Sequence, residues 1–167
     1  MADGPKIVGP GDGGFVDLGG LGIRFIVEGE ETGGQFALVE HPLEPRALGA
    51  PMHRHTNEDE YSYVIEGRMG AQLGEEVVFA EPGDLVFKPR GQWHTFWNAG
   101  DEPARLLELI SPPGFENYFR EMGELVADGP PDPERRAAIA AKYELEVDAD
   151  SVPGLVEGHG LRFGGAE

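Results

Sequence analysis

Three of the five histidines in the chain are spaced so that, with one glutamate, they could bind a metal ion. His53 and His55 are two residues apart on an expected strand, so their side chains leave it from the same face. Glu60 has the opposite parity, but turn-forming residues at 56–59 would let the chain reverse and bring Glu60 back facing the pair. His94 must come from a later strand. Three imidazoles and one carboxylate suit a divalent ion such as zinc, iron, nickel, cobalt or manganese.

Each part of this pattern also has an ordinary structural explanation. A His-x-His on a strand is more often incidental than a pair of ligands. His94 lies close to two tryptophans and could be a core histidine, and Glu60 ends an acidic run that is typical of an exposed loop. The conjunction of the four residues, rather than any one of them, favours a metal site.

The elements that must position these residues are short strands. High glycine and proline content, 26 and 14 residues, favours many strands joined by turns over long helices. The β-branched and aromatic pattern predicts strands near 15–18, 22–27, 35–39, 52–55, 61–65, 69–73, 77–79, 85–87, 93–97 and 105–110. Such regular spacing predicts an all-β antiparallel sandwich or barrel.

The pattern changes after Ser111-Pro112-Pro113-Gly114, and two short helices are expected on the outside of the barrel. The first follows an apolar stripe that ends at Val126, and the second begins at Asp132-Pro133, an N-cap acid followed by proline. We therefore expect a flexible arm at 1–14, a β-barrel at 15–113, a helical extension at 114–150 and a loosely held tail at 151–167. The spacing Gly9-x-Gly11-x-x-Gly14 lacks the strand–turn–helix context of a dinucleotide site, so no such cofactor is expected.

Two motifs in this sequence resemble those of the cupin superfamily. His53-x-His55, Glu60 and Gly67 follow the spacing of the family's first motif, and all fixed positions of the second are matched, by Gly83, Pro89, Gly91, His94 and Asn98. The leading glycine of the first motif departs from the pattern, because Gly49 stands four residues before His53 and not six. The resemblance implies a double-stranded β-helix, or jelly-roll barrel, with one divalent metal ion held by His53, His55, Glu60 and His94.

Within the superfamily, the chain is most similar to the single-domain quercetin dioxygenase-like group, through its short spacing from Gly67 to Gly83 and its exit from the barrel at 111–116. This likeness implies a dioxygenase that uses dioxygen to cleave a flavonol-like or other enolisable aromatic substrate, with Glu60 as both ligand and proton acceptor. One alternative is a non-oxidative polyketide-type cyclase or isomerase that uses the metal as a Lewis acid. Another is a small-molecule-binding cupin without turnover.

Composition limits the partners. A formal net charge of -18 repels phosphate backbones and anionic lipid, so neither nucleic acid nor membrane is an expected partner. The absence of cysteine excludes disulfides and thiolate ligands. No signal peptide is recognised, which makes a cytoplasmic location the expectation. A mostly apolar small molecule is the expected substrate, and an outward apolar stripe of Tyr61, Tyr63 and Ile65 predicts a homodimer.

Overall fold

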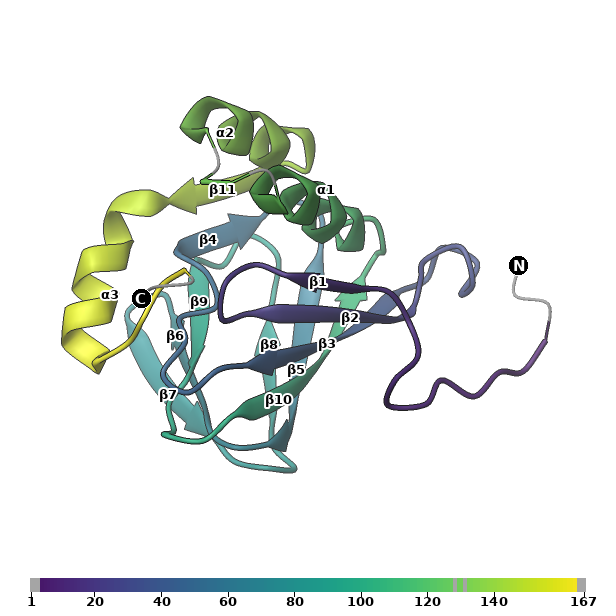
Figure 1. Ribbon diagram of the computed structural model, residues 1–167, viewed down its shortest axis with the longest axis horizontal. Coiled ribbons are helices and arrows are strands. Elements are labelled where there is room, and N and C mark those ends of the chain that lie inside the picture. The colour runs from purple at the N-terminus through teal and green to yellow at the C-terminus, as the bar shows by residue number, and fades with distance from the viewer. Residues whose placement is uncertain (1–3, 128, 131, 165–167) are drawn as a thin grey trace.

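Two antiparallel sheets face each other in the computed structural model, which describes residues 4–127, 129–130 and 132–164 (Figure 1). In one sheet the described strands follow the order β1-β2-β3-β10-β5-β8, and in the other β11-β4-β9-β6-β7. Their bounds are β1 (Phe15–Asp17), β2 (Gly22–Val27), β3 (Ala37–Leu43), β4 (Met52–His55), β5 (Asp59–Glu66), β6 (Met69–Leu73), β7 (Glu76–Ala80), β8 (Leu85–Lys88), β9 (His94–Asn98), β10 (Ala104–Ser111) and β11 (Leu145–Asp148). The predicted double-stranded β-helix is confirmed.

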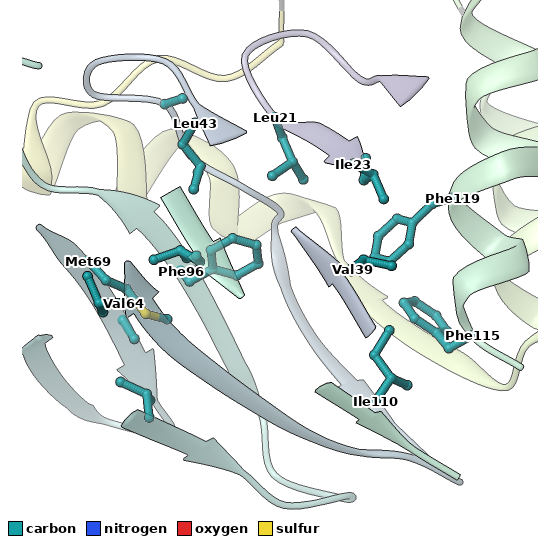
Figure 2. Close-up of a cluster of buried hydrophobic side chains, with 14 of the residues drawn as sticks. Leu21, Ile23, Val39, Leu43, Val64, Met69, Phe96, Ile110, Phe115 and Phe119 are labelled. Carbon is teal, nitrogen blue, oxygen red and sulfur yellow. The ribbon is translucent and has the colours of Figure 1, made fainter. Parts of the chain in front are cut away.

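The core lies between the two sheets. Along β10, residues alternate between buried and half-buried positions, which is the period of two expected when one face of a strand packs inward. Figure 2 shows side chains of both sheets pointing into this space, with Phe115 and Phe119 reaching in from the start of the first helix towards Ile110 and Val39. Burial of such side chains stabilises the fold by about 1.5–3 kcal/mol each.

Helices α1 (Glu116–Ala127) and α2 (Pro133–Lys142) confirm the two helices predicted from the sequence. The side chain of Asp132 caps α2 by accepting a hydrogen bond from the backbone N–H of Glu134 at 3.1 Å. Both helices lie beside the end of the barrel where β4 and β11 run (Figure 1). The described helices include none that is long and apolar enough to span a membrane.

The C-terminal segment differs from its prediction as a loosely held tail. A 3₁₀ turn, η1 (Ala149–Ser151), leads into α3 (Val152–His159), and Leu155 and Leu161 are buried against Trp97 of β9. His159 also stacks on the Trp97 indole, with ring centroids 4.5 Å apart. The tryptophan ring lies so close to Gly70 that an added Cβ would meet its Nε1 at 2.2 Å. Trp97 on the outer face of the sheet therefore provides the apolar surface against which the C-terminal segment packs.

The segment before β1 extends away from the barrel (Figure 1). Its residues from Gly4 onward are mostly exposed, although Arg24 holds it with hydrogen bonds to the carbonyls of Gly9 and Asp12. Flexibility of this arm, and the division of the chain at residues 14, 113 and 150, stay predictions.

Candidate metal centre

The four residues singled out in the sequence are brought together by three strands. His53 and His55 point inward from β4, Glu60 from β5 and His94 from β9, and all four are buried. His53 lies directly opposite His94 in the β4–β9 pairing. One nitrogen or oxygen atom from each residue lies within 4.8 Å of those of the other three. The structure therefore holds a buried cluster of three imidazoles and one carboxylate that could bind a metal ion.

Backbone carbonyls fix the orientation of two of the imidazoles. His53 Nδ1 donates a hydrogen bond to the Pro51 carbonyl at 2.8 Å, and His94 Nδ1 donates to the Gln92 carbonyl at 2.9 Å. Because a carbonyl can only accept, the proton of each neutral ring lies on Nδ1, and Nε2 presents its lone pair to the cluster. Burial lowers the pKa of His53 well below its ordinary value and also lowers that of His94, which keeps both rings neutral.

The contact between His94 and Glu60 shows that the cluster suits a cation. His94 Nε2 lies 3.2 Å from Glu60 Oε2, yet both atoms offer lone pairs when the imidazole is neutral. His55 Nε2 lies 3.5 Å from the same oxygen, and neither His55 ring nitrogen has a hydrogen-bond partner among the described residues. Lone pairs that converge in a buried space need a proton or a metal ion between them. The donor set fits a divalent transition metal.

Glu60 is held as an anion by neighbouring cations. Burial by itself favours the neutral acid, but the Lys88 ammonium and the His55 ring hold the pKa of Glu60 well below its usual range. Lys88 Nζ forms an ion pair with Glu60 Oε2 at 3.0 Å, and the lysine side chain is 1 % exposed. An ionised carboxylate is the form that a metal ion requires.

Glu58 is a buried part of the site that the sequence did not indicate. An acidic run of this kind is typical of an exposed loop, but the Glu58 side chain is 8 % exposed and its Oε2 lies 3.4 Å from His55 Nδ1. Burial lowers the pKa of His55, but the carboxylates of Glu60 and Glu58 outweigh this effect and raise it to about 9. The other acid of the run, Asp59, points away and pairs with Arg90 at 2.8 Å.

A cluster of four aromatic side chains contacts one of the candidate ligands through Phe115. Phe115 packs edge-on against the His55 ring, with centroids 4.3 Å apart. Tyr118 stacks on Phe115, with ring centroids 4.8 Å apart, and Phe119 and Tyr143 contact the Phe115 ring edge-on. We call these four residues the aromatic layer. The apolar spacing in the sequence predicts the stripe of α1 and its packing on the barrel. It does not predict the contact between Phe115 and His55.

The fold and the site geometry agree with the family comparison. Residues 39–110 match the family described as Cupin domain. KdgF from Halomonas sp. superposes with a TM-score of 0.60 at 17% sequence identity, covering 68% of this chain and 99% of that protein, which is a likeness of fold. The cupin family therefore matches the part of the chain that carries both motifs.

Two curated proteins are similar to parts of this chain. The tetracenomycin polyketide synthase protein TcmJ of Streptomyces glaucescens is 40% identical over 60 residues, which are 36% of this chain and 40% of that protein. Quercetin 2,3-dioxygenase of Bacillus subtilis (strain 168) is 25% identical over 122 residues, 72% of this chain and 35% of the enzyme. The chain thus matches well under half the length of each of these relatives.

Proposed function

We propose that this cupin is a metal-dependent enzyme that acts on an enolisable aromatic small molecule, most closely in the manner of a dioxygenase on a flavonol-like substrate. The observation that carries the proposal is the buried cluster of His53, His55, Glu60 and His94, in which an ionised carboxylate lies among converging imidazole lone pairs. The similarity to quercetin 2,3-dioxygenase over 72% of the chain supports the reaction class.

The chain's own residues have distinct roles in this proposal. His53, His55, Glu60 and His94 would hold the metal, which supplies Lewis-acid polarisation of substrate oxygens and, for a redox-active ion, reactivity towards dioxygen. Glu60 Oε2 accepts the proton of the substrate hydroxyl, which lies beside it when the substrate is bound. Phe115, packed edge-on against the His55 ring and itself buried, keeps water away from that side of the ligand cluster.

A non-oxidative cyclase or isomerase of polyketide-type substrates is the second candidate. It is favoured by the 40% identity to TcmJ, a protein whose name places it with a polyketide synthase. The same four ligands and the same proton acceptor serve both reactions, because each begins by removing a proton from an acidified hydroxyl or enol. The two candidates differ in whether dioxygen is consumed.

Dioxygen consumption separates the two reactions. With a redox-active metal bound, turnover of a flavonol panel should consume dioxygen and place labelled oxygen in the product, as measured with an oxygen electrode and mass spectrometry. The control is the same assay under argon, where turnover should stop. Untouched flavonols under oxygen, together with cyclisation of a polyketide-like substrate under argon, would exclude the dioxygenase and support the cyclase.

The homodimer remains a prediction that the outer surface supports. Tyr63 on β5 is 42% exposed, and Leu85 and Phe87 on the adjacent edge strand β8 are 57% and 46% exposed. The described helices leave these side chains uncovered, so a second copy could bury them. Light scattering at micromolar concentration should give about twice the chain mass of 18.0 kDa, and Phe87→Asp should halve it. A wild-type mass near 18.0 kDa would refute the dimer.

A further inference from the structure

A buried chain of charges lies directly behind the candidate metal centre. Lys88 stands opposite Glu60 in the β5–β8 pairing, and Glu108 stands opposite Ser62 in the β5–β10 pairing. Lys88 Nζ lies 3.0 Å from Glu60 Oε2 and 2.9 Å from Glu108 Oε1, and Ser62 Oγ donates a hydrogen bond to Glu108 Oε2 at 2.5 Å. All four side chains point into the barrel and are buried.

Stability alone does not account for this arrangement. Taking an ammonium group out of water is costly, and a buried ion pair is often no more stable than apolar side chains of the same volume. Beyond its two carboxylate partners, Lys88 Nζ also lies 5.0 Å from the centre of the Phe96 ring. The Lys88 ammonium instead acts directly on Glu60, the one carboxylate of the cluster, because it lies against the oxygen that would bind the metal.

Lys88 shares with the imidazoles the oxygen through which Glu60 faces the cluster. Glu60 Oε2 lies 3.2 Å from His94 Nε2 and 3.5 Å from His55 Nε2, and it is also the partner of Lys88 Nζ. A metal ion bound at this oxygen competes with the ammonium for its lone pairs and is repelled by its charge. Glu108 offsets part of that charge from the opposite side of Lys88. The two members of the Lys88–Glu108 pair therefore act on Glu60 in opposite directions.

We propose that Lys88 and Glu108 are positioning residues that set how strongly Glu60 binds the metal and keep its carboxylate in place when it acts as proton acceptor. This inference rests on the proposed function of the cluster. Lys88 would weaken the hold of Glu60 on the ion and, through its ion pair, keep the carboxylate in place as it accepts the substrate proton. Glu108, held by Ser62, limits this effect so that the ion is retained.

The test compares three variants by their affinity for Zn²⁺ and Ni²⁺ at pH 8, measured by competition with a chromophoric chelator. Lys88→Met should bind each ion at least about tenfold more tightly, because a nearby positive charge is lost while the bound ion itself keeps Glu60 ionised. Glu108→Gln should bind at least about tenfold more weakly, because the Lys88 charge is then uncompensated. The double variant removes both charges and should return towards the wild-type affinity. Lys88→Met should also turn over substrate at least tenfold more slowly despite its tighter metal binding.

A purely structural ion pair would behave differently. Loss of either partner would then lower metal affinity and thermal stability together, and such a common direction would overturn the inference while the proposed function stands. Wild-type protein that binds neither ion would overturn the proposed function itself. Arg105→Met is the matched control, because among the described residues Arg105 pairs from β10 with Glu40 and Glu66 and not with the cluster. The metal affinity of this variant should stay within about twofold of wild type.

Discussion

Glu60→Gln protein should retain much of its metal and lose roughly 10²- to 10⁴-fold in turnover rate, the usual contribution of a positioned general base. Glutamine keeps the size of the side chain and one ligating oxygen, but its amide cannot accept the substrate proton. Glu60→Ala should lose both the metal and the rate. Elemental analysis and steady-state kinetics on the same preparations separate these two effects.

The neighbouring acids provide controls for this result. Asp59 pairs with Arg90 away from the cluster, so Asp59→Asn should leave the rate within about twofold of wild type. Glu58 contacts His55 Nδ1, and Glu58→Gln should weaken metal binding by about 10- to 100-fold, the usual effect of losing a partner of a metal ligand. If metal-loaded Glu60→Gln turned over at a near-normal rate, Glu60 would be a charge-balancing ligand and not the proton acceptor.

Substitution of His53, His55 or His94 by alanine should weaken metal binding by more than about 100-fold while most of the β structure remains. This loss of metal affinity is larger than the loss caused by removing a residue that only hydrogen-bonds to a ligand, because a direct bond to the ion disappears. Metal content is measured by elemental analysis and the fold by circular dichroism. The control is His159→Ala, because His159 stacks on Trp97 outside the barrel and should not affect the metal. Full metal occupancy in any one variant would remove that histidine from the ligand set.

Acid should release the metal from wild-type protein. A protonated imidazole cannot bind an ion, and in the metal-free site the pKa of His55 is raised to about 9. The proton therefore competes with the metal from about pH 9 downward, so affinity should fall as the pH falls. Loss should be extensive below about pH 6, where the remaining imidazoles of an opened site also take up protons.

The cluster itself could be predicted because its signals are local. Parity on one strand places His53 and His55 on one face, and turn-forming residues before Glu60 indicate a reversal. The inward direction of His94 required the resemblance to a known motif, because nothing near it in sequence shows which strand it pairs with. The structure places it opposite His53.

Lys88 and Glu108 could not be predicted because, as for His94, their surroundings depend on strands that are distant in sequence. Lys88 precedes Pro89 at the end of a predicted strand, where a lysine is ordinarily solvent-exposed. Its burial depends on the register between β5 and β8, which places it opposite Glu60. One local signal was available: on β5 the buried face carries Glu60 and Ser62, whereas the outer face carries tyrosines. Polar residues on the buried face indicate a functional interior.

The elements after residue 144 also depended on contacts distant in sequence. Strand β11 forms by pairing residue for residue with β4, from Leu145 opposite His55 to Asp148 opposite Met52. Three glycines at or just after α3 lower its helix propensity, and its packing against Trp97 compensates for this. Composition alone therefore indicated a loose tail.

An anomalous difference map from a crystal of metal-loaded wild-type protein would locate the metal ion relative to the four proposed ligands. We expect one peak per chain, at about 2.0–2.2 Å from a nitrogen of His53, His55 and His94 and from a Glu60 carboxylate oxygen. Crystals of His94→Ala soaked in the same ion provide the comparison and should show little or no density there. A strong peak elsewhere in the wild-type protein, or an empty cluster at saturating metal, would show that these four residues do not form the metal site.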